Sequence, residues 1–327
     1  MPHPRGARRS TVDSAFALPI TLMAFGRARS PPSSAPQEHA LAPPSAVPAS
    51  AVELETPLFF ESAGRPLYGV FHPPARERPG APVLVQCHGL GIEQITTYRV
   101  EVLNARAAAA AGIPVLRYHA RGHGDSAGDF SAVDFDGLVE DALAAAAEAR
   151  RLARREHTAW LGVRFGTLVA ARAACSDPTS RALALWEPAH RSADYFREQL
   201  RGMLFSQVAQ GERPSATVDQ LMERLGRDGT VDVHGYYLHR RIVDSSREQD
   251  LGNTLAAWTG RTLVVQIENR ARLSPRTAAL VADLESRAVK VSSTMVREVP
   301  GWTFVQNPAW ECASLVNETS RWLDAVE

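Results

Sequence analysis

The chain has 327 residues, of which 45% are hydrophobic and 22% charged, and its formal net charge is zero. This length suits one large α/β domain or two small ones, and the neutral charge removes the electrostatic basis for a nucleic-acid partner. The three cysteines lack the spacing of a zinc site or a disulfide framework. No apolar run reaches the ~20 residues that cross a bilayer. We expect a cytoplasmic protein with no cofactor, no metal and no transmembrane segment.

Residues 1–52 differ in composition from the rest of the chain. The stretch 31–50 is rich in Pro, Ala and Ser without a period, and such a composition buries too little apolar surface to offset its ordering entropy. The basic start and the short apolar run before it are features of a targeting peptide, although Asp13 and Pro19 interrupt the pattern. We predict a disordered extension over 1–52, with a targeting segment as the alternative, and a folded domain over 53–327.

Strand-like and helix-like runs alternate along the rest of the chain. Strands are expected at 57–64, 65–74, 81–89, 113–118, 157–163, 181–188, 261–269 and 289–300. Helices are expected at 97–112, 134–155, within 164–175, at 273–287 and within 307–326. Such alternation predicts an α/β fold: a mostly parallel sheet that starts with an antiparallel pair and is covered by helices on both faces.

The regular alternation is interrupted at about 189–259. This stretch has a helical pattern with turn signals, and its apolar residues recur at helix-like spacing, among them Met203, Phe205, Leu221, Leu225 and Tyr236 to Leu238. Because it separates two strands of the sheet, we expect a helical cap over the carboxyl edge, where open α/β sheets bind ligands. Such a cap shapes a hydrophobic pocket or docks a partner.

Three motifs occur in the order and on the elements expected of an α/β-hydrolase. QCHGLG at 86–91 matches the oxyanion loop, and RYHARGHGDSAG at 117–128 matches the loop after the next strand. The turn GVRFG at 162–166 lies between a strand and a helix, which is the setting of the nucleophile elbow. Its two glycines are needed because strand and helix crowd this turn. The sequence therefore predicts the α/β-hydrolase fold.

The catalytic positions carry the wrong residue types. The elbow position that should hold Ser, Cys or Asp is Arg164, whose guanidinium stays protonated and has no lone pair. The acid should follow the next-to-last strand, where counting gives Arg270 or Ala271. The histidine should follow the last strand, where Thr303 stands. Loss of one member of a Ser-His-Asp triad already costs orders of magnitude in rate, so no working triad is predicted.

From about Leu54 to its end, the chain resembles a known bacterial group. The segments ALALWEPAHRSADYFREQLRGML, GVRFG, VDVHGYYL and VVQIENRARLSP are similar to the exosortase A system-associated hydrolase-like proteins. These belong to the α/β-hydrolase superfamily, are often labelled with the serine aminopeptidase (S33) family, and include members with GxRxG at the elbow. The resemblance implies hydrolysis of an ester, thioester or amide in an envelope or polysaccharide-associated system. Because this sequence differs from the family's catalytic pattern at every catalytic position, we expect this chain to share the family's fold and not its activity.

Arg164 has two interpretations. In the first, it adds to the backbone N–H groups of Leu90 and Phe165 at a helix N-terminus and forms an anion site. A carboxylate, a phosphate or an acyl carrier group would bind there, and Arg270 would be a second cationic side chain that binds the anion. The protein would then bind a small anionic or acyl ligand.

In the second interpretation, Arg164 is a buried structural residue. A buried guanidinium needs a carboxylate partner, and Glu187, at the end of the adjacent strand, is the first candidate, with Glu268 as the other. The pair would fill the former active site and leave a scaffold that binds a protein partner.

A third hypothesis keeps catalysis with displaced groups. Polar side chains near the same rim are Cys87, His88, His119, His123, Asp125, Ser126 and His190. His88 is expected to support the oxyanion loop and Ser126 its own loop, with base and nucleophile roles as the alternatives. The predicted function is therefore a non-hydrolytic ligand-binding or partner subunit, a pseudoenzyme. The alternative is a hydrolase (esterase-, thioesterase- or peptidase-like) or an acyltransferase.

Overall fold

The structure is a computed structural model that describes residues 55–268, 272–303 and 310–326. The predicted extension over 1–52 lies outside these ranges, as do Arg270 and Ala271.

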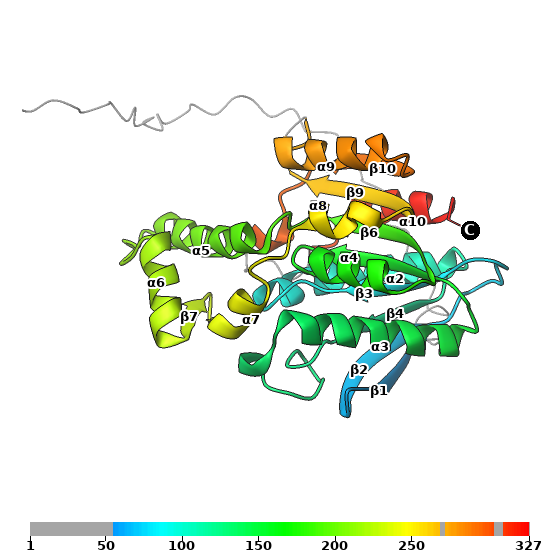
Figure 1. Cartoon of the computed structure of the whole chain (residues 1–327), viewed down its shortest axis with the longest axis horizontal. Helices are drawn as coiled ribbons and strands as arrows, with labels where there is room; N and C mark the ends of the chain where they lie inside the picture. The colour runs from blue at the N-terminus through cyan, green and yellow to red at the C-terminus, as the bar shows by residue number, and fades with distance from the viewer. Residues whose placement is uncertain (1–54, 269–271, 304–309, 327) are drawn as a thin grey trace, which may run out of the picture. The chain divides into compact units, whose positions relative to one another are not determined.

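Eight strands form one sheet in the order β1-β2-β4-β3-β5-β6-β9-β10 (Figure 1). Their bounds are β1 Thr56–Ser62, β2 Arg65–His72, β3 Val83–Cys87, β4 Val115–Tyr118, β5 Thr158–Val163, β6 Ser180–Trp186, β9 Arg261–Ile267 and β10 Val291–Val296. Strand β2 pairs antiparallel with β1 and with β4, and the remaining neighbours are parallel. The predicted antiparallel start and parallel sheet are confirmed.

The central strands are buried on both faces, which explains their continuous apolar runs. In β5, Trp160 packs into one core cluster, whereas Ala159, Leu161 and Val163 pack into the other. Side chains alternate along a strand, so each strand contributes to both clusters. The two clusters are the two halves of a three-layer core.

The helices that cover the sheet divide between these two clusters. Apolar residues of α3 (Phe135–Ala153), α4 (Gly166–Ser176) and α9 (Pro275–Ser286) belong to the first, and those of α2 (Ile92–Ala110) and α10 (Ala313–Leu323) to the second. The predicted helices are present, although α2 begins five residues before the predicted start. No helix among the described residues has the length and hydropathy needed to span a bilayer.

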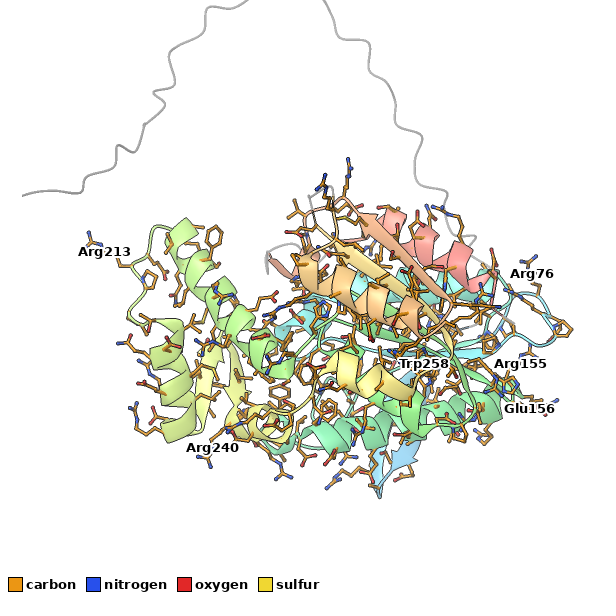
Figure 2. The ribbon with its side chains drawn as sticks, turned by 45° about the horizontal axis from the view of Figure 1, so that its top comes forward. Arg76, Arg155, Glu156, Arg213, Arg240 and Trp258 are labelled. Carbon is orange, nitrogen blue, oxygen red and sulfur yellow. The ribbon has the colours of Figure 1, made fainter. Side chains whose placement is uncertain are left out.

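Between β6 and β9 the chain leaves the sheet, and we call residues 187–260 the β6–β9 segment. It contains α5 Ser192–Ala209, α6 Val218–Asp228, β7 Thr230–Val233, β8 Tyr236–His239, α7 Arg240–Ser245, α8 Leu251–Thr254 and the 3-10 helix η2 Leu255–Ala257. In Figure 1, α5, α6 and β7 lie beyond the end of the sheet to which the β9 arrowhead points. Arg213 and Arg240 project outward from this segment (Figure 2).

The helical pattern predicted for this segment is wrong at Tyr236 to Leu238. These residues lie in β8, which pairs antiparallel with β7. His234 and Gly235 connect the two strands with φ of 55° and 84°, and two left-handed residues are what a tight hairpin turn requires. The segment therefore presents a β-hairpin as well as helices.

Candidate functional site

A sharp turn joins β5 to α4, as predicted, and Arg164 lies in it with φ of 53°. A Cβ atom on Gly162 would overlap the backbone of Gly166 and Thr167. A Cβ atom on Gly166 would overlap the carbonyl oxygens of Cys87 and His88. Both glycines are therefore required by close backbone approach, and Arg164 holds a conformation that non-glycine residues rarely adopt.

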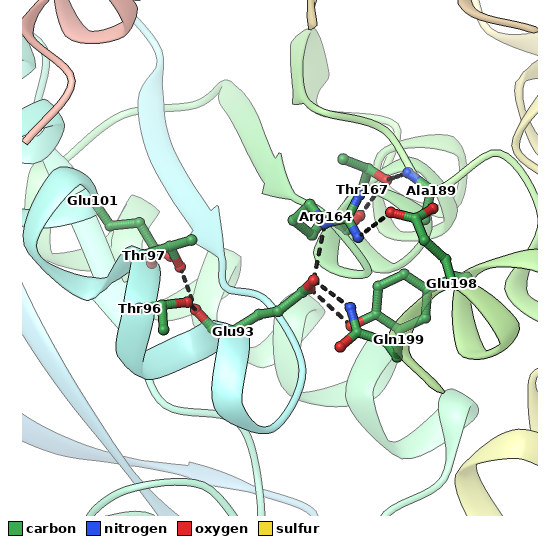
Figure 3. Close-up of polar contacts among 10 residues, drawn as sticks. Glu93, Thr96, Thr97, Glu101, Arg164, Thr167, Ala189, Glu198 and Gln199 are labelled. Carbon is green, nitrogen blue, oxygen red and sulfur yellow. Dashed lines mark hydrogen bonds and ion pairs between the residues drawn. The ribbon is translucent and has the colours of Figure 1, made fainter. Parts of the chain in front are cut away.

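The Arg164 side chain is buried and bound by two carboxylates (Figure 3). Its Nε donates to Glu93 Oε1 at 2.9 Å, and its Nη2 donates to Glu198 Oε1 at 2.8 Å. The Glu93 side chain is 1% exposed and that of Glu198 is 56% exposed. One partner therefore comes from the core and the other from the solvent side, and the guanidinium is not free to receive a further anion at these two nitrogens.

The carboxylate of Glu93 accepts further hydrogen bonds from side chains of α5. The Tyr195 hydroxyl donates to Glu93 Oε2 at 2.8 Å, and Gln199 Nε2 donates to Glu93 Oε1. The rings of Tyr195 and Trp302 lie 5.5 and 5.0 Å from the guanidinium carbon of Arg164, within the range of a cation–π interaction. We define the Arg164 network as Glu93, Arg164, Tyr195, Glu198 and Gln199.

The charge on Arg164 is maintained inside this network. Burial opposes that charge, but the carboxylates of Glu93 and Glu198 outweigh it and raise the pKa of Arg164 above its ordinary value. An arginine held this way offers no base and no nucleophile. The turn therefore carries a fixed positive charge that is neutralised within the protein.

Glu187 is not the ion-pair partner of Arg164, so that prediction is wrong. Its carboxylate instead accepts a hydrogen bond from the N–H of Ile267 at 2.6 Å. Burial raises the pKa of Glu187 to about 7, although the charge of Arg164 acts in the opposite direction. The other candidate, Glu268, accepts a hydrogen bond from the Gln266 side chain at 2.8 Å.

The two predicted anion-binding donors lie at the ends of their loops. The backbone N–H groups of Leu90 and Phe165 donate to no acceptor in the part of the chain that the structure describes. Both residues line a cavity of about 10 Å³, which is about the room of a single water molecule. The role of these N–H groups stays a prediction.

His88 joins the loops after β3 and β4. Its Nε2 accepts a hydrogen bond from the N–H of Ala120 at 3.0 Å, and its Nδ1 lies 2.7 Å from the carbonyl oxygen of Gly89. Because that oxygen can only accept, Nδ1 carries the proton. Burial holds the pKa of His88 well below its ordinary value, so the imidazole is neutral and both nitrogens are engaged.

Ser126 is held by the backbone. Its hydroxyl donates to the carbonyl oxygen of His119 at 2.6 Å and accepts from the N–H of Tyr68 at 2.8 Å. A nucleophilic serine would instead donate to a base. Ser126 therefore fastens its loop to β2.

Of the remaining predicted residues, Cys87 and His123 line the same small cavity as His88, whereas His190 and Thr303 do not line it. His190 Nε2 lies 3.1 Å from the Thr277 hydroxyl. Cys87 is buried, and burial raises the pKa of its thiol to about 12. Thr303 closes the 3-10 helix η3 (Gly301–Thr303). Within 55–268, 272–303 and 310–326, no three His, Cys, Asp or Glu side chains are placed to hold a metal ion.

Comparison with solved structures identifies the fold of this chain. Est1E from Butyrivibrio proteoclasticus, solved with ferulic acid bound, is similar over 82% of this chain and 96% of its own, with 17% identity and a TM-score of 0.58. The Pyrococcus furiosus esterase Pf2001 is similar over 82% of this chain and 91% of its own, with 14% identity and a TM-score of 0.54. These similarities show the α/β-hydrolase fold.

A search of curated proteins gave no match. The family model described as serine aminopeptidase, S33, matches residues 79–251, which is more than half of the chain. The matched region runs from the approach to β3 into α8 and includes the turn of Arg164. The chain therefore belongs to the serine aminopeptidase S33 family of α/β-hydrolases.

Proposed function

We propose that this chain is a non-hydrolytic binding or partner protein in which Arg164 occupies the nucleophile position of an α/β-hydrolase. The observation that carries the proposal is the burial of Arg164 at the strained turn, between the carboxylates of Glu93 and Glu198. A serine in that place would attack a carbonyl, whereas a protonated guanidinium cannot.

The other two catalytic positions support the same proposal by residue type. At the acid position the sequence has Arg270 or Ala271, and at the histidine position it has Thr303. Neither Arg nor Ala orients an imidazole, and Thr is no base at neutral pH. Arg270 and Ala271 lie outside the described residues, so this support comes from the sequence.

The interpretation of Arg164 as a buried structural residue is favoured over its interpretation as part of an anion site. Glu93 and Glu198 already accept hydrogen bonds from Nε and Nη2 of the guanidinium. An external anion at these nitrogens would have to displace the buried carboxylate of Glu93 or the exposed one of Glu198. We propose that the β6–β9 segment is a cap that closes this position, since α5 contributes Tyr195 and Glu198 to the network. A role in an envelope or polysaccharide-associated system follows only from the resemblance to exosortase-associated proteins.

A fluorophosphonate probe and short p-nitrophenyl esters test the proposal on the full chain. We expect no labelled serine and ester hydrolysis at the buffer rate from a sample whose cooperative thermal unfolding shows that it is folded. The Ser126→Ala variant is the matched control. Labelling or hydrolysis that disappears in Ser126→Ala would overturn the proposal and establish a hydrolase or acyltransferase with a displaced nucleophile.

A further inference from the structure

A hollow of about 440 Å³ lies outside the Arg164 network. Its lining comes from the first turns of α2, the loop between β4 and α3, and the β7–β8 hairpin. The lining shares no residue with the network. The volume is in the range of small-molecule sites, roughly 300–1,000 Å³. The hollow is therefore large enough to be a binding site of its own.

Rings dominate the lining, which includes Tyr98, His119, His123, Phe130, Tyr236, Tyr237 and His239. Several of these rings contact one another. The centroids of Tyr98 and His119 are 6.0 Å apart. The centroid of Phe130 lies 5.0 Å from that of His123 and 5.8 Å from that of His239. Such distances are typical of packed aromatic pairs, so these rings support one another around the hollow.

The loop after β4 fixes the His119 ring. A Cβ atom on Gly124, where φ is 51°, would overlap that ring. The N–H of Asp125 donates to His119 Nδ1 at 3.3 Å. The ring therefore packs directly on the backbone of its own loop, and this part of the lining is formed before any ligand arrives.

Exposed apolar side chains are concentrated around this hollow. Of the eight exposed large hydrophobic residues in the part of the chain that the structure describes, four line it: Ile95, Tyr98, Tyr236 and Tyr237. Single exposed apolar residues are ordinary, but a group around one hollow marks a binding surface. A ligand that covers these side chains is favoured because it removes apolar surface from water.

The lining itself carries no charge that would select an ion. Among the described residues, no Asp, Glu, Lys or Arg side chain lines the hollow. Burial lowers the pKa of His119, and it lowers that of His123 to about 4, so both rings are neutral near pH 7. The faces of aromatic rings carry the negative side of a quadrupole. An anion would therefore meet no counter-charge in this lining.

Two charges of opposite sign lie beside the lining. The guanidinium carbon of Arg117 lies 5.2 Å from the centroid of the Tyr98 ring, where it repels a second cation. The carboxylate of Asp125 lies 3.9 Å from His119 Nδ1, but its side chain is 71% exposed, so water and salt screen its charge. A cation therefore gains no net attraction from this pair, and the surroundings favour a neutral ligand.

We propose that the hollow binds an uncharged aromatic ring, which packs against Tyr98 and against the tyrosines of the β7–β8 hairpin. The aromatic lining offers such a ring offset-stacked and edge-to-face contacts. The proposal goes beyond the proposed function and does not depend on it, because the site shares no residue with the Arg164 network. Its test measures binding and is independent of ester hydrolysis.

A matched charge series tests the site on the full chain. 2-Naphthalenemethanol, 2-naphthoate and 2-naphthylmethylammonium carry the same ring system with no charge, a negative charge and a positive charge. Calorimetric titration at about pH 8 compares their affinities above the ordinary pKa of histidine. We expect the alcohol to bind about tenfold more tightly than either ion, because an ion loses hydration without gaining a counter-charge. Equal affinities, or no binding up to the solubility of the alcohol, would overturn the proposal.

A pair of truncations locates the ring. Tyr98→Ala removes one of the lining rings and is expected to weaken the alcohol severalfold. Phe205→Ala, at an exposed residue outside the lining, is expected to leave its affinity unchanged. Binding that is unaltered in folded Tyr98→Ala would contradict the proposed place of the ring.

A pair of charge insertions tests why ions are rejected. Ile95 lines the hollow and is 47% exposed, so Ile95→Lys adds a cation at the site without burying it. We expect this variant to bind 2-naphthoate severalfold more tightly than the wild type does, and Phe205→Lys to bind it as the wild type does. An equal gain in both variants would show that the net charge of the chain, and not this hollow, governs binding, and the proposal would fall.

Discussion

Arg164 and Glu187 follow neighbouring parallel strands, and both have left-handed backbone conformations, with φ of 53° and 44°. Such conformations cost a non-glycine residue on the order of 1–3 kcal/mol and persist only where the surroundings hold them. The N–H of Arg164 donates to the Trp186 carbonyl at 3.0 Å, and that of Glu187 donates to the Val265 carbonyl at 2.7 Å. Each strand end is therefore fixed by the next strand of the sheet.

The raised pKa of Glu187 predicts a pH-dependent stability. The folded-state pKa is about 7, against an ordinary value of 4.5, so the folded protein binds the proton more tightly than the unfolded chain. The stabilising contribution is complete below about pH 4.5 and is lost as the pH rises through about 7. Glu187→Gln, which keeps the acceptor for Ile267, should gain about 1–3 kcal/mol relative to wild type between about pH 5 and pH 8.

Urea denaturation at several pH values measures this difference. Glu212→Gln, a change at an exposed carboxyl, serves as the control and should follow the wild-type profile. Parallel profiles for wild type and Glu187→Gln would contradict the prediction.

At this scale the sequence predicted the place of Arg164 but not its partners. The turn was predictable because Gly162 and Gly166 mark it locally. Glu93 was not, because the predicted helix began at residue 97, whereas α2 begins at Ile92. The first turn of α2 has no apolar periodicity, since the carboxylate of Glu93 faces Arg164 and the hydroxyl of Tyr195. Polar burial of this kind follows from tertiary contacts that no local pattern encodes.

At the scale of elements, the start of α4 lies very close to the backbone of the loop after β3. A methyl group at position 166 would overlap the carbonyl oxygens of Cys87 and His88, and backbone cannot move aside cheaply. We expect Gly166→Ala to destabilise the protein by several kcal/mol or to prevent folding. Gly226, inside α6, has open space around its Cβ position, so Gly226→Ala should stabilise by about 0.5–1 kcal/mol.

Midpoints of chemical denaturation for the two variants provide the comparison. The pair is matched, because each adds one methyl group to a glycine of a helix. Similar effects of the two substitutions would show that crowding at Gly166 does not govern this junction.

The elements of the sheet were predictable, because strand burial on both faces leaves long apolar runs such as β5 and β9. The β7–β8 hairpin was missed, although a signal was present. The run Thr230–Val233 alternates polar and apolar residues, and His-Gly follows it at 234–235, which together indicate a hairpin. The tyrosines beyond the turn fitted a helical spacing equally well, and a short run does not distinguish the two periods.

For the whole molecule, the Arg164 network fastens the β6–β9 segment to the core, because α5 supplies Tyr195, Glu198 and Gln199. Arg164→Met would leave the Glu93 carboxylate buried without its cation. Breaking a buried pair in this way costs about 3–5 kcal/mol, and hydrogen exchange should accelerate most in α5. Glu198→Gln removes a partner that is 56% exposed, so it should cost less than about 1 kcal/mol.

Hydrogen–deuterium exchange with denaturant titration separates these outcomes. Adding Glu93→Gln to Arg164→Met removes the unpaired charge and should recover part of the lost stability. Equal losses in Arg164→Met and Glu198→Gln, or exchange in α5 that stays at the wild-type rate, would show that the network does not hold the segment.

Helix α2 supplies Glu93 of the Arg164 network from its first turn, whereas Arg164 and Tyr195 lie 71 and 102 positions further along the chain. Contacts between residues so far apart in sequence form only after a long loop has closed. The pair of Glu93 and Arg164 closes the shorter of the two loops, so we expect α5 to dock on the carboxylate of Glu93 after that pair has formed.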